Sequence, residues 1–307
     1  MNNSITAIRG VRVGHYTNPQ ARTGCTVILF DGGAVCGVDV RGGAPGTRET
    51  ELLSGYHLVE RTNALLLTGG SAYGLDAAGG IMKYLEERKI GNEKNGIYVP
   101  IVPGAVLYDL GVGDPTVRPG PTDGYRACEE ASDAPVPDGS IGAGTGATIG
   151  KCLGKEYASR GGIGNAIVRL PGGVFVAALI AVNALGDVYD HRTGERISGA
   201  MKDGSPLNCY DTLLKGNGEG GPTNTTIGAI VTNAKLTREE ANRMALIAHD
   251  GLAMSIRPVH TPSDGDTLFA ASTNEISGAN LLSLFTAAAE VTALAVENAV
   301  RNAANQK

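Results

Sequence analysis

Asn224 and Thr225 stand where a polar, glycine-rich stretch runs into an apolar one, in GEGGPTNTTIGAIVTNAKLT at residues 218–237. A threonine hydroxyl is a poor nucleophile unless a base takes its proton. A free α-amino group, with a pKa of about 7.7–8.0, can serve as that base near neutral pH. Cleavage before Thr225 would therefore give one residue both roles. The ordinary alternative is a threonine that simply begins a strand, because threonine favours strands.

Two carboxylates, Asp264 and Asp266, lie one residue apart in SDGDTLFAAST. Such a pair could be half of a calcium loop, but the other ligands of an EF-hand are absent from the sequence around it. A second ordinary possibility is a turn before a strand, where aspartate is common. The pair is therefore a candidate for chemistry only together with other residues.

The elements around Thr225 suit self-cleavage. Residues 190–223 are rich in Gly, Asp, Asn and Pro and lack periodicity, which predicts a long exposed loop. The apolar run 226–233 predicts a buried strand. Thr237 and Glu240 form a capping box, which predicts that a helix follows the strand. A flexible loop before Thr225 and a rigid strand after it are thus predicted, as self-cleavage at this residue requires.

The remaining pattern mixes hairpins with helices. We predict two antiparallel strands over 157–170 and 174–182, and two short strands joined by a turn at Asp31–Gly33. Helices are predicted from Ser71 to Gly91 and over the Ala-rich terminal stretch 279–305. The order lacks the regular strand–helix alternation of a Rossmann fold. It favours one α/β (α+β) domain over residues 1–307, with sheets covered by helices in layers.

Other catalytic motifs fail on spacing. GAGTGATIGK would need glycine at Thr145 and a hydroxyl at Cys152 to be a phosphate loop. GGSAYG has Tyr73 where a nucleophile elbow needs glycine. The five histidines form no metal-binding pair of the HExxH kind, and each is more simply structural or exposed.

Composition excludes several classes of partner. The net charge is −5 and the basic residues form no run, which disfavours nucleic acid. No stretch approaches 18 uninterrupted apolar residues, and the N-terminus lacks a signal-peptide pattern, so we expect no membrane span. The five cysteines form no CxxC pair, which supports neither a zinc knuckle nor a disulfide scaffold. We expect a cytoplasmic protein that needs no metal and no cofactor.

Long motifs in order, from the N-terminal region to the last strand, resemble one family. They are GVDVRGGAPGTRETELL, LLLTGGSAYGLDAAGGIMKYLEE, PIVPGAVLYDL, GATIGK, GGIG, AVNALGDV, NTTIGAIVTNAKLT and SDGDTLFAAST. The family is that of the self-processing N-terminal-nucleophile amidohydrolases. It includes the DmpA-type L-aminopeptidase/D-esterase, the β-peptidyl aminopeptidases and the nylon-oligomer endo-hydrolase.

The resemblance implies a four-layered α-β-β-α sandwich, related to the ornithine acetyltransferases. It implies self-cleavage between Asn224 and Thr225 into chains 1–224 and 225–307, which stay associated. A homo-oligomer, often a tetramer, is the family expectation. The implied substrate is a small peptide or another amide.

The resemblance also implies roles for single residues. Thr225 matches the nucleophile, and Asn183 in AVNALG matches the asparagine whose amide points at the oxyanion. Asp264 and Asp266 match an Asp-x-Asp pair of the nylon-hydrolase branch. On a strand both side chains would point to one face, where one could orient the Thr225 hydroxyl and amine and the other hold an ammonium group. Close carboxylates should also differ in pKa.

Lys151 and Tyr108 are matched to the site through glycine-rich loops, and the alternatives are a solvated lysine and a packed tyrosine. The aminopeptidase members carry Ser-x-Glu where this chain has Asp-x-Asp. The difference leaves open whether the enzyme trims N-terminal residues or cleaves another amide, such as a linear amide oligomer. An acyltransferase of the ornithine type and an unprocessed binding protein remain alternatives.

Overall fold

The computed structural model describes residues 2–218 and 224–305. Its main sheet has the strand order β10-β11-β16-β18-β2-β4-β7-β3, and β1 pairs with β2 beside this path. The strands are β1 (Val11–Asn18), β2 (Thr23–Val40), β3 (Thr47–Arg48), β4 (Thr62–Thr68), β7 (Gly104–Val106), β10 (Gly162–Leu170), β11 (Val174–Asn183), β16 (Thr225–Ala234) and β18 (Thr267–Ile276).

Strand β2 joins two halves of this sheet. Its first part pairs with β1 and β4, and its last part, from Val35 to Val40, pairs with β18. The predicted turn at Asp31–Gly33 is therefore wrong, because the chain continues as one strand. The register to β4 shifts between Leu29 and Ala34, so these residues form an irregularity where the strand passes from one half-sheet to the other.

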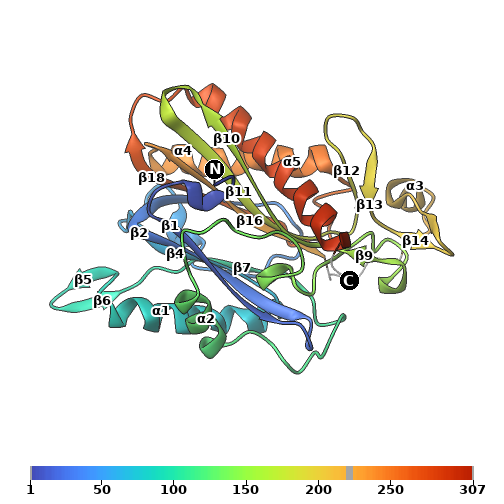
Figure 1. Ribbon diagram of the computed structural model, residues 1–307, viewed down its shortest axis with the longest axis horizontal. Coiled ribbons are helices and arrows are strands. Elements are labelled where there is room, and N and C mark those ends of the chain that lie inside the picture. Colours follow the sequence, from blue (N-terminus) through green and yellow to red (C-terminus); the bar gives the residue numbers. More distant parts are fainter. Residues whose placement is uncertain (1, 219–223, 306–307) are drawn as a thin grey trace.

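Three separate apolar clusters give the molecule its layers (Figure 1). One lies between the two half-sheets. The second lies between the β10-β11-β16-β18 half and two helices, and the third between the β1-β2-β4 half and two other helices. The predicted four-layered α-β-β-α sandwich is thus confirmed. Its covering helices are α4 (Arg238–Ser255) with α5 (Leu281–Asn305) on one side, and α1 (Ala77–Glu87) with α2 (Pro121–Glu129) on the other.

The first part of β2 shows how the sequence builds these layers. Val27 and Leu29 belong to the cluster under α1 and α2, whereas Ile28 and Phe30 belong to the cluster between the half-sheets. Successive strand side chains point to opposite faces. Because both faces are covered, the strand is apolar at every position from Val27 to Phe30 rather than alternating with polar residues.

Helix α5 confirms the predicted terminal helix. By length and apolar composition it could cross a membrane, and 50% of its most apolar stretch is buried within the protein. It packs on β10, β11 and α4. Nine of its twelve buried residues are alanine or valine, small side chains that let the helix lie close to the sheet. Its apolar character is therefore accounted for by the sandwich core.

The predicted long loop is wrong for its described part. Residues 190–218 contain short elements, and residues 219–223 lie outside the described residues. The reason is the buried carboxylate of Asp187, which accepts hydrogen bonds from the Ala200 and Cys209 amides at 2.8 and 2.7 Å and from Arg196 at 3.2 Å. The elements are β13 (Arg196–Ser198), β14 (Met201–Lys202), β15 (Ser205–Pro206) and α3 (Cys209–Leu214).

Two local predictions are confirmed and one is adjusted. β10 and β11 form the predicted hairpin across Pro171–Gly173, and the capping box of Thr237 and Glu240 begins α4. The predicted helix from Ser71 begins instead as a 3-10 helix. The remaining elements are η1 (Ile5–Ala7), η2 (Glu51–Leu53), η3 (Ser71–Asp76), η4 (Gly142–Gly144), η5 (Lys155–Tyr157), η6 (Pro171–Gly173), β5 (Asn92–Lys94), β6 (Ile97–Val99), β8 (Thr148–Ile149), β9 (Ser159–Arg160), β12 (Asp187–Tyr189) and β17 (Ile256–Arg257).

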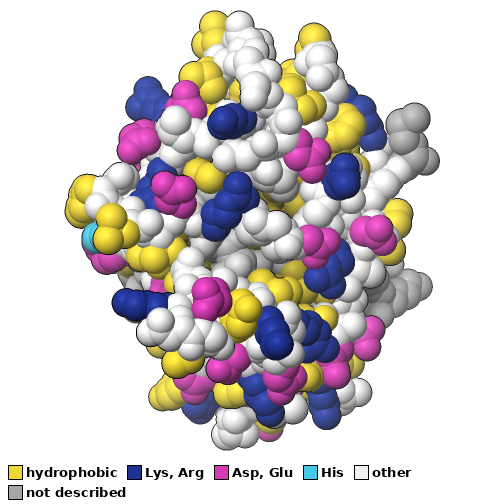
Figure 2. Space-filling view, turned by 90° about the vertical axis from the view of Figure 1, so that its left-hand side faces the viewer, with side chains coloured by type: hydrophobic (Ala, Val, Ile, Leu, Met, Phe, Trp, Pro, Cys, Tyr) yellow, Lys and Arg dark blue, Asp and Glu magenta, His cyan; other side chains and the backbone are white. Residues whose placement is uncertain are grey.

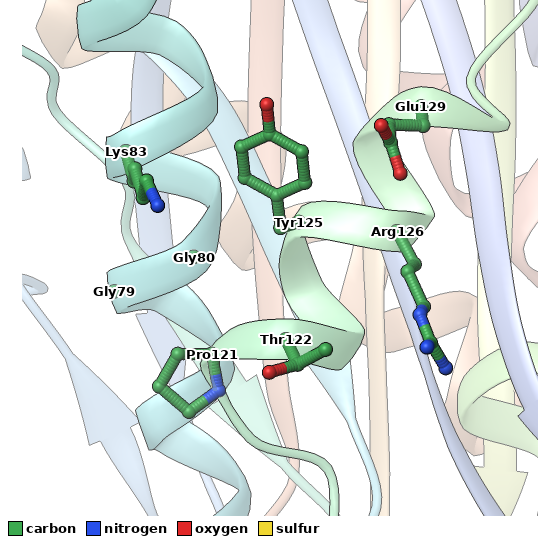
Figure 3. Close-up of a pocket in the computed structure, with 8 residues that line it drawn as sticks. All are labelled: Gly79, Gly80, Lys83, Pro121, Thr122, Tyr125, Arg126 and Glu129. Atoms are coloured by element: carbon green, nitrogen blue, oxygen red, sulfur yellow. The ribbon is translucent and has the colours of Figure 1, made fainter.

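Neighbouring glycines on α1 give a matched stability test. Figure 3 shows Gly79 and Gly80 on α1 beside Pro121 and Thr122 at the start of α2. A Cβ on Gly80 would lie 1.7 Å from the Pro121 carbonyl oxygen, whereas a Cβ on Gly79 meets nothing closer than 3.9 Å. We expect Gly80→Ala to lower the free energy of unfolding by about 1–3 kcal/mol. Gly79→Ala should leave it unchanged or raise it by up to about 1 kcal/mol.

Urea denaturation of both variants measures this difference. Equal destabilisation by the two substitutions would contradict the close crossing of α1 and α2.

Charges are mixed on the face shown in Figure 2, where basic and acidic side chains lie interspersed. On that face no single-sign patch of the kind that binds nucleic acid is present.

Candidate active site

Thr225 is the first residue of β16, an inner strand of its half-sheet. It lies at the end of the strands where three chain segments meet. It pairs with Asn183, the last residue of the antiparallel strand β11. On its other side, β16 runs parallel to β18, so the segment before β18 lies beside the segment before β16. Asn224 accordingly forms a parallel bridge with Asp264. Sheet register alone thus gathers Thr225, Asn183 and the Asp-Gly-Asp turn.

The carbonyl oxygen of Asn224 receives two donors. The Gly265 amide donates to it at 3.0 Å, and the Thr225 hydroxyl donates to it as well. The side chain that could attack this carbonyl therefore lies against it, and a backbone N–H points at the oxygen where charge would develop. Thr225 is 5% exposed, so the arrangement is shielded from bulk water.

Asp264 and Asp266 lie in the turn before β18, which begins at Thr267. The predicted position of the pair within a strand is wrong, because the turn must first carry the chain past Asn224. Asp264 accepts from the Thr261 amide and hydroxyl at 2.8 and 2.6 Å. Asp266 accepts from the Thr226 amide at 2.7 Å.

In the described residues neither carboxylate is hydrogen-bonded to the Thr225 hydroxyl, which donates to Asn224 instead. The predicted orienting role toward Thr225 therefore stays a prediction.

The motif RGGAPG supports this turn. The Arg41 and Gly42 amides donate to the Asp266 carbonyl at 3.0 and 3.3 Å, and the Ala44 amide donates to the Asp264 carbonyl at 2.8 Å. The chain after β2 therefore fixes the backbone on which both carboxylates stand.

Lys151 and Asn183 form a buried polar group beside Thr225. The Lys151 ammonium donates to the Asn183 side-chain and main-chain oxygens at 2.9 and 3.0 Å. The Asn183 side-chain oxygen also accepts from the Thr148 amide at 3.0 Å. The Asn183 amide donates to the carbonyl of Tyr108 at 3.0 Å. Tyr108 thus reaches the site through its backbone.

Burial decides the electrostatics of this group. It lowers the pKa of Lys151 to about 7, although the Asp264 and Asp266 carboxylates raise it. Burial, and next the charge of Asp266, raise the pKa of Asp264 to about 6, against the Thr261 donors and Lys151. The predicted difference in pKa between the two carboxylates stays a prediction. Two groups that can exchange protons near neutral pH therefore lie in one shielded site.

The raised pKa of Asp264 makes stability depend on pH. Between about pH 4 and 6 the folded chain holds a proton that the unfolded chain has lost, so the stability from this residue falls as pH rises through that window. Between pH 4 and 6 this decrease in the free energy of unfolding is on the order of 1–3 kcal/mol, and we expect Asp264→Asn to abolish it. Urea denaturation at pH 4 and pH 6, in an uncleaved Thr225→Ala background, measures it.

The exposed Asp203→Asn serves as the control for this pH series. A difference between pH 4 and 6 that Asp264→Asn leaves unaltered would contradict the assignment.

The sequence model of Peptidase family S58 matches residues 3–307. The chain belongs to peptidase family S58. An uncharacterized aminopeptidase of Mycobacterium tuberculosis is 44% identical over 301 residues, covering 90% of this chain and 83% of that protein. A 6-aminohexanoate-oligomer endohydrolase of Paenarthrobacter ureafaciens is 34% identical over 274 residues, covering 87% and 74%.

Two solved structures superpose on this chain over most of its length. A Burkholderia sp. beta-aminopeptidase superposes with a TM-score of 0.69 at 25% identity, covering 97% of this chain and 86% of the other. An L-aminopeptidase D-Ala-esterase/amidase from Ochrobactrum anthropi, described as a variant of the Ntn hydrolase fold, superposes with a TM-score of 0.73 at 20% identity, covering 97% and 85%. The protein is thus an S58 hydrolase that acts on amide or peptide bonds.

The structure brings all the predicted site residues of this S58 chain into one region, and adds others. The Gly265 amide was missed because a backbone donor leaves no side-chain signature, although the glycine between two aspartates was visible. Thr148 and Thr261 are common hydroxyl residues without a distinguishing spacing. The contribution of Thr226 is its amide, which any residue but proline would supply.

Proposed function

We propose that the chain cuts itself between Asn224 and Thr225, and that Thr225 then hydrolyses amide bonds as an N-terminal nucleophile. The observation that carries this proposal is the Asn224 carbonyl, which accepts from both the Thr225 hydroxyl and the Gly265 amide. These two contacts support the proposal, because the hydroxyl and a backbone donor meet at the same carbonyl.

Self-cleavage would begin when the Thr225 hydroxyl oxygen attacks the Asn224 carbonyl carbon. Negative charge then develops on the carbonyl oxygen that faces the Gly265 amide. The hydroxyl proton passes through a base to the leaving nitrogen of Thr225, which leaves an ester between the two residues. Water hydrolyses this ester, giving a carboxylate on Asn224 and a free amine and hydroxyl on Thr225. Lys151, with a pKa of about 7, suits the role of base near neutral pH.

Turnover would repeat this chemistry on an external amide. The new α-amine takes the hydroxyl proton as Thr225 attacks the amide carbonyl, and passes it to the nitrogen of the substrate. The C–N bond breaks, the amine leaves and Thr225 carries the acyl group as an ester, which water hydrolyses to a carboxylate. We assign the oxyanion donor to the Asn183 amide, which the family resemblance implies and which lies opposite Thr225 in the sheet. Such a donor typically contributes about 10²–10³ in rate.

The proposed substrate is a small amide that carries a nearby ammonium group. The 6-aminohexanoate-oligomer endohydrolase and the aminopeptidases named above are relatives whose names point to such compounds. Asp264 and Asp266 supply the acidic partner. A panel of amino-acid amides, peptides, β-peptides and 6-aminohexanoate oligomers distinguishes the aminopeptidase from the endo-amidase.

Intact-mass measurement of the purified protein tests the proposal. Two polypeptides, 1–224 and 225–307, should be found, and the smaller should begin at Thr225. A single uncut mass in a preparation that hydrolyses amides would overturn it. The associated chains are further proposed to form a cytoplasmic homo-oligomer, which light scattering of the cleaved protein tests for size.

A further inference from the structure

His260 contacts the carboxylate that holds the residue after Thr225. Its ring Nδ1 lies 2.7 Å from one oxygen of Asp266, and its main-chain amide lies 3.2 Å from the same oxygen. The other oxygen of Asp266 accepts from the Thr226 amide at 2.7 Å. Asp266 is 1% exposed, so the carboxylate has no solvent to replace these donors.

A second histidine packs against the His260 ring. His249 is fully buried and contacts His260 edge-on, with ring centroids 4.8 Å apart. The His249 Nε2 lies 3.0 Å from the carbonyl oxygen of Asp39, which assigns the proton to that nitrogen. Its other nitrogen, and the Nε2 of His260, have no hydrogen-bond partner among the described residues. Burial lowers the pKa of His249 to about 4, so its ring is neutral near neutral pH.

We propose that His260 is a positioning residue for the Thr225 nucleophile. Its Nδ1–H holds Asp266 in one orientation, and Asp266 in turn fixes the Thr226 amide and with it the peptide that bears Thr225. The inference rests on the function proposed above. In this arrangement His260 and Asp266 form a carboxylate–histidine pair, and the pair holds the backbone next to the nucleophile.

This hydrogen bond matters because a carboxylate can otherwise rotate. Attack on the Asn224 carbonyl requires the hydroxyl of Thr225 to stay against it, and displacements near 1 Å cost about 10²-fold in rate. In metal sites, the outer hydrogen bonds that orient a ligand typically contribute about 10–100-fold, and we expect the same scale for this carboxylate. The pairing of Thr225 with Asn183 holds one side of this backbone. The hydrogen bonds from His260 to Asp266 and from the Thr226 amide to Asp266 hold its other side.

The backbone at His260 decides which variants are informative. Its φ is +54°, a left-handed conformation that glycine adopts freely and asparagine tolerates. His260→Gly removes the ring donor while suiting the backbone. His260→Asn suits the backbone and retains a side-chain N–H near the position of Nδ1. The two variants therefore differ in the donor rather than in backbone strain.

The rate of self-cleavage is the readout, because the reacting carbonyl is part of the chain and substrate binding cannot contribute. Pulse-labelled precursor from cell-free translation is followed by gel electrophoresis. We expect His260→Gly to slow the appearance of the two chains about 10–100-fold. His260→Asn should stay within about threefold of the wild type. His15→Gly, which removes a partly buried imidazole bonded to Thr26 on the opposite half-sheet, serves as the control and should cleave at the wild-type rate.

Equal rates for His260→Gly and the wild type would overturn the positioning role. So would equal slowing by His260→Gly and His15→Gly, since that reflects general loss of stability. Failure of the wild type itself to cleave contradicts the proposed function instead, so the two failures are distinguishable.

Discussion

Thr225→Ala is expected to yield one uncut polypeptide of 307 residues with amidase activity reduced at least about 10⁴-fold. The substitution removes the hydroxyl that lies against the Asn224 carbonyl, and no cleavage means no α-amine to act as base. Thr225→Ser keeps a hydroxyl at the same position and should still give two chains. Intact mass and a hydrolysis assay on the same preparations measure both effects.

The neighbouring Thr226 supplies the matched control. Its hydroxyl is buried and has no hydrogen-bond partner among the described residues, while its amide donates to Asp266. Thr226→Ala retains that amide and should cleave and hydrolyse like the wild type. Two results would contradict the assignment of the nucleophile. One is self-cleavage of Thr225→Ala at the wild-type rate, and the other is loss of self-cleavage in Thr226→Ala.

Gly265→Ala is expected to slow self-cleavage by about 10²–10³-fold. The new Cβ would lie 2.8 Å from the Thr225 hydroxyl oxygen and 2.6 Å from the carbonyl oxygen of Ala44. Since the second contact is to backbone, the turn itself must move. Its movement displaces both the nucleophile and the amide that donates to the Asn224 carbonyl.

Gly32→Ala is the control for this substitution, because a Cβ there meets nothing within 4 Å. Time courses of cleavage and thermal denaturation of both variants, the latter in a Thr225→Ala background, separate the two possible effects. A cleavage rate of Gly265→Ala equal to that of Gly32→Ala would contradict the expected displacement of this turn and its effect on the nucleophile.

Features that depend on neighbours in the chain could be predicted from the sequence. The capping box at Thr237 and Glu240, the hairpin across Pro171–Gly173 and the long terminal helix all follow from spacing over a few residues. Motifs along the whole chain indicated the family, and with it the candidates Asn183 and Thr225. These signals are local or are carried by side-chain identity, and both are written in the sequence.

The path of the chain between layers could not be predicted in this way. Asp31–Gly33 has the composition of a hairpin turn, yet both flanking segments pair with other strands, so β2 continues through it. Likewise, the loop-like composition after residue 190 conceals short elements that the buried Asp187 organises. In both places contacts with distant residues outweigh local turn preference.

The sequence by itself indicated the family, because long motifs follow one another in order along the chain. The resemblance then implied the layered fold and the candidate nucleophile. Only the tertiary structure decided what surrounds Thr225. The parallel pairing of β16 with β18 sets the Gly265 amide on the Asn224 carbonyl and Asp266 on the Thr226 amide. These are backbone donors from segments about 40 residues apart. An N–H group has the same chemistry in almost every residue, so only register in three dimensions can select it.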